Sequence, residues 1–261
     1  MLHFEELYPD IYLLKVPFSG LWTGVMLIKG EENCLIDSGA KDTDVDQHIL
    51  PALAELGMDL HSVKWLLNTH SHGDHIGGHA RLTNLANLKV AAHASSAPKV
   101  ADPVPYAIET RTKFPEHSPA PQCYLKGVPV DRVLEDGEVV AGRLQEIHTP
   151  GHDDDCVCWY DIPTKTLITG DSLQGNGTPA RVLASIKIWS NICLLCRNYS
   201  SFRSIILCAD MITTESAGTS AGRKKSGRRC SCATKVPGGI MILSCGKIRR
   251  ESKILWRLPW R

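Results

Sequence analysis

The chain has 261 residues, and its 43% of hydrophobic and 22% of charged residues are typical of a globular protein rather than a disordered one. The net charge of +1 conceals an asymmetry: residues 1–181 carry 14 basic and 25 acidic side chains, whereas residues 182–261 carry 15 and 3. No apolar stretch is as long as a membrane span and no secretory leader is visible, so we expect a cytoplasmic protein with reduced thiols and no membrane partner.

The first sixty residues predict a small sheet followed by a helix. Strands are expected at 11–16, 24–28 and 34–37, where apolar residues run together. Helical spacing of apolar residues extends from Thr43 to Leu56, and Pro51 should kink that helix or mark its restart. Trp22, between the first two strands, has two open interpretations, substrate contact and core packing.

A cluster of three histidines and an aspartate follows the apolar strand expected at 63–67. In extended backbone His70 and His72 point to the same side, and the glycine after them lets the chain turn and aim Asp74 and His75 nearby. Imidazole and carboxylate ligands suit zinc or another first-row metal, and two such pairs suit two ions. The alternative is a polar loop that is histidine-rich by chance.

The region after this cluster predicts further alternation of helix and strand. A helix is expected over 74–86 and a strand at 89–92, followed by an insertion loop with one short helix at 98–125. A hairpin around Asp-Gly is expected at 132–140, a strand at 144–147 and a second hairpin formed by 156–160 and 165–169. Cys156 and Cys158 alternate along a strand, which favours buried apolar positions over a zinc knuckle.

The pattern His-x-His-x-Asp-His after an apolar strand resembles the metallo-β-lactamase superfamily of hydrolases. Leu35-Ile36-Asp37-Ser38-Gly39, His148-Thr149-Pro150-Gly151-His152 and Thr169-Gly170-Asp171 extend the resemblance, which covers about Tyr8 to Gly177. It implies an α/β fold, the four-layer αββα sandwich, here with an incomplete second half. It divides the chain into a metallo-β-lactamase-like domain at 1–181 and an atypical basic, Cys-rich tail at 182–261 that we expect to be poorly ordered.

The resemblance also assigns the site residues. His70, His72 and His148 would hold a first metal, Asp74 and His75 a second, and Asp171 would bridge them. Asp74 is also expected to act in catalysis. Two Zn²⁺ ions are expected, with Fe or Mn as alternatives, and hydroxide held between them would attack an ester, thioester, lactone or related bond of a small-molecule substrate.

Other polar residues are expected to support the ligands or the fold. Asp37 would accept a hydrogen bond from a ligand imidazole, although a surface aspartate in a turn is the alternative. His152 is expected to support a ligand rather than to bind metal. His79, His93 and His117 are expected to be surface or structural histidines.

The sequence departs from the family pattern in its last third. Relatives complete the second metal site with a late histidine, and here no histidine follows His152. A weakened second site and a catalytically impaired metal-binding product are therefore the alternative to an active hydrolase. The basic run 223–229 lacks interleaved aromatic residues, which argues against a nucleic-acid partner.

We hypothesise that residues from about 182 onward are a frameshifted translation of an ordinary carboxyl-terminal half of this family, which would explain the unusual tail. In the shifted reading frame, each original codon would consist of the third base of one present codon and the first two bases of the next. Read in that frame, codons that can encode residues 204–222 permit a strand that leads into Gly-His-Asp-Tyr. The histidine would arise where Asp210 meets Met211. Sequencing the coding DNA decides this hypothesis. The sequence carries no prediction of oligomeric state.

Overall fold

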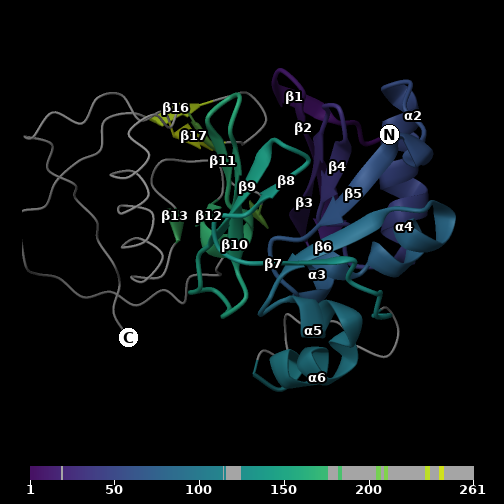
Figure 1. Ribbon diagram of the computed structural model, residues 1–261, viewed down its shortest axis with the longest axis vertical. Coiled ribbons are helices and arrows are strands. Elements are labelled where there is room, and N and C mark those ends of the chain that lie inside the picture. Colours follow the sequence, from purple (N-terminus) through teal and green to yellow (C-terminus); the bar gives the residue numbers. More distant parts are fainter. Residues whose placement is uncertain are drawn as a thin grey trace, which may run out of the picture.

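The computed structural model describes residues 1–18, 20–113, 115 and 125–175, together with the main chain of short strands at 182–183, 204–206, 209–210, 233–235 and 241–243. Two β-sheets face each other, and helices cover the outer side of the first one (Figure 1). This is the αββα sandwich predicted from the sequence. The proposed domain boundary at residue 181 stays a prediction, and most of the tail lies outside the described residues.

The first sheet runs in the order β1-β2-β3-β4-β5-β6-β7, with β15 paired to β3. Its strands are β1 (Glu5–Tyr8), β2 (Ile11–Phe18), β3 (Leu21–Ile28), β4 (Asn33–Ile36), β5 (Val63–Leu67), β6 (Lys89–His93), β7 (Arg132–Leu134) and β15 (Ala209–Asp210). β4 to β7 are mutually parallel, so the loops after β4, β5 and β6 leave the sheet at one edge. That edge receives the histidine-rich segment 68–75, called the loop below, whose last residues form the start of helix α3 (Gly73–Ile76).

The second sheet runs in the order β16-β17-β14-β11-β10-β9-β8. Its strands are β8 (Val139–Val140), β9 (Leu144–His148), β10 (Val157–Asp161), β11 (Thr166–Ile168), β14 (Ser204–Ile206), β16 (Ala233–Lys235) and β17 (Met241–Leu243), while β12 (Gln174–Gly175) and β13 (Val182–Leu183) form a separate pair. The hairpin expected from 156–169 is confirmed, since β10 and β11 pair antiparallel.

The hairpin expected at 132–140 is wrong. β7 pairs with β6 in the first sheet, whereas β8 pairs with β9 in the second, so the Asp-Gly turn carries the chain from one sheet to the other. The physical reason is burial: Leu134 and Val140 both pack in the apolar layer between the sheets, each from its own side. Local turn chemistry therefore indicated the turn but not the partners of its two strands.

Among the described residues, the α-helices are α1 (Asp42–Asp44), α2 (Leu50–Glu55), α3 (Gly73–Ile76), α4 (His79–Leu85), α5 (Ala97–Ala101) and α6 (Pro103–Lys113). A π-helical segment, Val45–Ile49, separates α1 from α2, and Pro51 stands in the first turn of α2. This agrees with the expected restart, because proline cannot donate an intrahelical hydrogen bond. The helix expected at 74–86 divides into α3 and α4, separated by Gly77 and Gly78.

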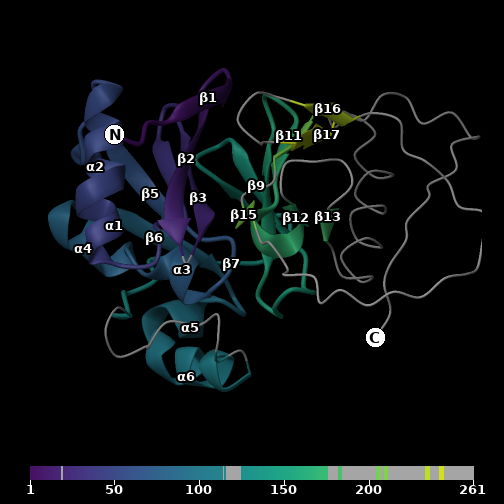
Figure 2. The same cartoon turned by 180° about the vertical axis from the view of Figure 1, so that it is seen from behind.

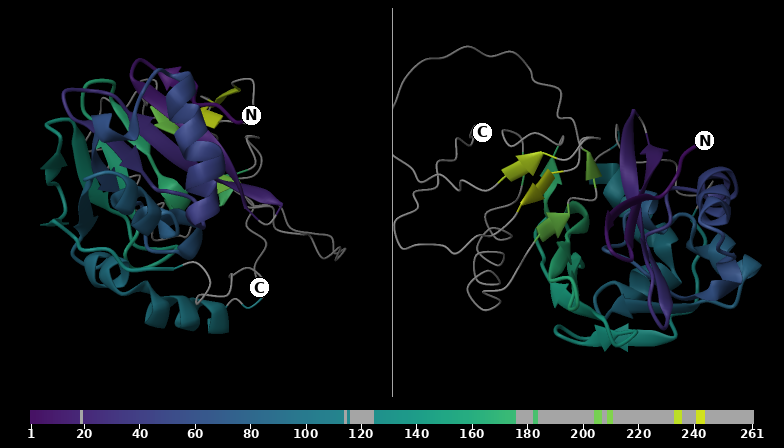
Figure 3. Two further views of the ribbon diagram at one scale, coloured as in Figure 1. Left: turned by 90° about the vertical axis from the view of Figure 1, so that its right-hand side faces the viewer. Right: turned by 90° about the horizontal axis from the view of Figure 1, so that it is seen from above.

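Close packing of two loops explains that interruption. A side chain at Gly77 would place its Cβ 2.0 Å from the carbonyl oxygen of Ala40, so only glycine lets the two main chains meet there. Residues 98–125 contain two helices, α5 and α6, where one short helix was expected, and 116–124 lie outside the described residues. Figure 2 and Figure 3 show α5 and α6 beyond one end of the first sheet.

Two apolar layers hold the sandwich together. One lies between the first sheet and α2 and α4, and the other lies between the two sheets, where Trp159 is fully buried. Cys156 and Cys158 are buried free thiols, as expected, and burial raises the pKa of both. Among the described helices, none has the length and apolar character that a bilayer crossing requires.

Candidate metal centre

The loop after β5 is tied to both sheets, which holds its histidines in place. The main-chain oxygen of Asn68 accepts a bond from the indole of Trp159 (3.1 Å), and that of Thr69 accepts one from Val157 N–H (2.8 Å). On the other side, Ser38 N–H donates to the carbonyl of His75 (2.8 Å). The loop is therefore positioned by strands of both sheets rather than by its own conformation.

Two groups of side chains converge at this loop. The ring nitrogens of His70, His72 and His152 lie within 4.8 Å of one another, and so do those of His70 and His75 with an oxygen of Asp171. In the first group, His72 Nδ1 lies 3.0 Å from His152 Nε2. His70 belongs to both groups, which therefore adjoin.

Carboxylates line the second group. Asp171 Oδ1 lies 3.3 Å from His75 Nε2, and its Oδ2 lies 3.5 Å from His152 Nε2 in the first group. Asp74 Oδ2 lies 3.5 Å from His75 Nε2 and accepts a hydrogen bond from Thr23 Oγ1 (3.0 Å). Asp171 thus has one carboxylate oxygen near a histidine of each group.

Asp37 organises the inner side of the centre. It is buried, and its carboxylate accepts bonds from Thr69 N–H, from Thr69 Oγ1 and from His75 Nδ1, each at 2.8 Å. Because the single hydroxyl proton of Thr69 goes to Asp37, Thr69 Oγ1 can only accept from His70 Nδ1, 3.1 Å away. His70 Nδ1 therefore carries the proton, and His70 Nε2 keeps its lone pair.

That lone pair has no partner in the part of the chain that the structure describes. His70 Nε2 is buried without a hydrogen bond to any described residue. Burial, followed by the neighbouring histidines, holds the pKa of His70 well below its usual value, so the ring is neutral. A buried, neutral imidazole with an unused lone pair is the state in which histidine binds a metal. The donor set therefore fits a first-row cation.

In the absence of a metal ion, His75 differs from the neutral His70 in its charge state. Burial alone would lower the pKa of His75, but the carboxylates of Asp74, Asp171 and Asp37 raise it well above its usual value. Three carboxylates around one imidazole stabilise a positive charge at this position, which a proton or a metal ion can supply. The second group is thus electrostatically suited to a cation.

His148 does not lie with either group, which contradicts its expected place beside His70 and His72. It is the last residue of β9, its ring stacks on that of His93 at 4.2 Å, and its Nε2 lies 2.9 Å from the carbonyl oxygen of Asp154. The chain leaves the strand after His148 and returns over the loop only at His152. The Pro-Gly turn between them was the available signal, since it moves the second histidine off the strand.

A third acidic group, Asp153-Asp154-Asp155, follows His152. Its carboxylates surround the ammonium of Lys99, which lies 3.3 Å from Asp153 and 3.4 Å from Asp155 and also pairs with Asp154. The cation for this group is therefore the ammonium of Lys99 on α5, and the three carboxylates compensate for the partial burial of its charge.

Comparisons with known proteins relate this chain to one family and one fold. A sequence profile described as the metallo-beta-lactamase superfamily matches residues 23–196. The lactamase-like protein ptaB of Pestalotiopsis fici is 30% identical over 159 residues, which are 60% of this chain and 41% of that protein. An atrochrysone carboxyl ACP thioesterase of Pseudocercospora fijiensis is 26% identical over 155 residues, 58% and 37% of the two chains. The chain thus spans about two fifths of the length of these curated relatives.

Solved structures share the fold. The native metallo-beta-lactamase of Legionella gormanii superposes with a TM-score of 0.57 at 21% identity, covering 78% of each chain. A metallo-beta-lactamase family protein of Thermus thermophilus gives a TM-score of 0.56 at 24% identity, covering 79% of this chain and 75% of that one.

Proposed function

Because the chain belongs to the metallo-beta-lactamase superfamily, we propose that it is a metal-dependent hydrolase that cleaves an ester, thioester, lactone or related bond of a small molecule. The observation that carries the proposal is the buried lone pair of His70, which faces two adjoining groups of imidazoles and carboxylates. Several relatives are named as atrochrysone carboxyl ACP thioesterases, which favours a thioester among these bonds.

In this proposal His70, His72 and His152 hold one ion, Asp74 and His75 hold a second, and Asp171 lies between them. This ligand set replaces the predicted His148 with His152 and keeps the other five residues. Zinc, or iron or manganese in its place, supplies Lewis acidity that polarises a carbonyl and favours loss of a proton from water.

The protein's own residues contribute orientation. Asp37 accepts the Nδ1 proton of His75 and, through Thr69, fixes the Nδ1 proton of His70, so both rings present Nε2 to the site. Thr23 holds the carboxylate of Asp74 from β3. Ligands that are already oriented lose less entropy when they bind an ion, so these outer hydrogen bonds strengthen the site.

Replacing two histidines tests the assignment. We expect His152→Ala to lose metal, measured by elemental analysis of the purified protein, and to lose hydrolysis of an aryl thioester by more than the roughly 10- to 100-fold that follows loss of an outer partner. His148→Ala should retain both, because its ring lies outside the two groups. Wild-type turnover in His152→Ala would refute the ligand set, and so would undiminished turnover in His72→Ala.

A second candidate function is metal binding without efficient turnover. It is favoured by one observation, that no histidine follows His152 in the chain, so the second group has fewer imidazoles than the family pattern. Purified protein that holds about one ion and hydrolyses none of the ester, thioester and lactone probes would select this alternative.

A frameshift would account for this shortage of imidazoles, and the position at which the shifted frame would encode a histidine adjoins β15. Ala209 and Asp210 pair with Thr23 and Trp22 of β3, and Thr23 is the residue that bonds Asp74. A histidine encoded at the junction of Asp210 and Met211 in the shifted frame would follow directly from this strand. Coding DNA that cannot yield Gly-His there would eliminate the hypothesis.

A further inference from the structure

The imidazole of His72 is contacted on both nitrogens, and the two contacts differ in chemistry. Its Nδ1 lies 3.0 Å from Nε2 of His152, another proposed ligand, while its Nε2 lies 3.2 Å from Oδ2 of Asp153. An ionised carboxylate accepts hydrogen bonds and cannot donate one, so this contact places the ring proton on Nε2. The lone pair of His72 is then on Nδ1, the nitrogen that faces the other histidines.

Asp153 is itself held by groups that come from a separate part of the chain. The hydroxyl of Tyr106, on α6, donates to the same Oδ2 that contacts His72. The ammonium of Lys99, on α5, lies 3.3 Å from Oδ1. The main-chain N–H of Asp154 completes the set by donating to Oδ1 at 2.7 Å. With these donors present, the carboxylate cannot rotate away from His72 without losing several hydrogen bonds.

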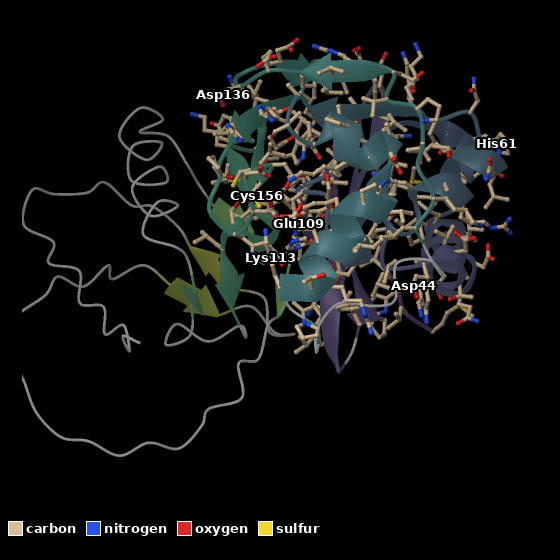
Figure 4. The ribbon with its side chains drawn as sticks, turned by 90° about the horizontal axis from the view of Figure 1, so that it is seen from below. Asp44, His61, Glu109, Lys113, Asp136 and Cys156 are labelled. Atoms are coloured by element: carbon tan, nitrogen blue, oxygen red, sulfur yellow. The ribbon has the colours of Figure 1, made fainter. Side chains whose placement is uncertain are left out.

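Ring contacts reinforce the same arrangement. The ring of Tyr106 lies nearly parallel to that of His72, with an interplanar angle of 13° and 6.0 Å between centroids. Lys99 Nζ lies 4.2 Å from the centre of the Tyr106 ring, within the range of a cation–π contact. In Figure 4, the labels Glu109 and Lys113 mark α6, and the label Cys156 marks the residue directly before β10.

We propose that Asp153, held by Tyr106 and Lys99, is a positioning residue that selects the Nε2-protonated form of His72 and so prepares Nδ1 to bind a cation. This inference deepens the proposed function, on which it rests. It gives α5 and α6 a role, because these helices stabilise the orientation of a ligand from outside the metal centre. No direct contact of Asp153 with a substrate is required.

The test compares Asp153→Asn with Asp154→Asn in the full chain. The asparagine amide at 153 can donate to Nε2 and removes the preference for a proton there, whereas Asp154 is largely exposed and does not contact His72. We expect Asp153→Asn to weaken Zn²⁺ binding by roughly 10- to 100-fold in competition with a chromophoric chelator. Asp154→Asn should bind zinc as wild type does. Equal weakening in both variants would assign the effect to net charge and overturn the proposal.

Nitrogen NMR of the metal-free protein provides a readout that is independent of zinc. Long-range ¹H–¹⁵N spectra should show His72 protonated on Nε2 in the wild type and in Asp154→Asn, with this preference lost in Asp153→Asn. If Asp153→Asn does not fold, Tyr106→Phe takes its place in the test. This variant keeps the ring contact and removes one donor to Asp153, so the tautomer preference of His72 should change in the same direction but by less. An unchanged His72 tautomer in Asp153→Asn would overturn the proposal. Failure of the wild type to bind zinc would instead refute the proposed function and leave the tautomer result to decide this inference.

Discussion

Replacing Glu146 by glutamine tests how the second sheet packs against the first. The Glu146 side chain is buried on β9, neither of its oxygens has a hydrogen-bond partner among the described residues, and its Oε1 lies 3.7 Å from Nε2 of His93 on β6. Burial, and then the carboxylates of Asp136, Glu138 and Glu135, raise the pKa of Glu146 to about 8. Glutamine keeps the size of the side chain and removes the ionisation.

The sign of the effect follows from proton binding. Between the ordinary value of 4.5 and about 8, the folded protein keeps a proton on Glu146 that the unfolded chain has lost. The free energy of unfolding therefore falls as pH rises through this range, by up to ~1.4 kcal/mol per pH unit. From pH 5.5 to 7.5 the contribution of this group amounts to about 2.5 kcal/mol, which Glu146→Gln should recover.

Urea unfolding followed by tryptophan fluorescence at the two pH values measures this difference. Glu55→Gln, an acid-to-amide change at an exposed position of α2, is the matched control and should follow the wild type at both pH values. All other titrating groups are common to the proteins and cancel in the comparison. A stability difference between Glu146→Gln and wild type that is the same at pH 5.5 and 7.5 would refute the assignment of a neutral, buried carboxyl group.

Two further predictions concern the metal centre. Gly170→Ala should lower the free energy of unfolding by about 1–3 kcal/mol more than Gly57→Ala in urea titrations. Both glycines have positive φ, but only at Gly170 would a Cβ lie 2.5 Å from Thr69 Cβ. Equal losses in the two variants would contradict the packing argument. Zinc binding at neutral pH should release protons, and its apparent affinity should rise with pH, because the raised pKa of His75 leaves a proton that the ion must displace. Calorimetry in buffers of different ionisation enthalpy measures the number released, and a value of zero would contradict the charge state of His75.

The two apolar layers and the position of the centre are related. Parallel strands β4, β5 and β6 end at one edge, so Asp37 and the loop 68–75 meet there without any long-range signal in the sequence. Asp171 joins them because β10 and β11 bring the second sheet to the same edge, where Trp159 and Val157 bond to the loop. The centre therefore depends on the contact between the sheets.

The sequence alone determined those features whose physical cause is local. The strand at 63–67 has the predicted bounds, because an apolar run of that length before a histidine-rich loop admits few other conformations. His70, His72, Asp74 and His75 lie close together in the structure because they lie within six positions of the chain, and strand alternation orients the first two.

Tertiary structure decided what depends on the path of the chain between elements. Spacing could not distinguish His148 from His152, since both flank one Pro-Gly turn and only the return of the loop places His152 within 3.0 Å of His72. It could not pair Tyr106 with Asp153, which are 47 positions apart, or place the strands of the 132–140 segment in different sheets. The physical reason is that side-chain direction within a strand is a local property, whereas the partner that a side chain meets is set by the burial of distant apolar residues against one another.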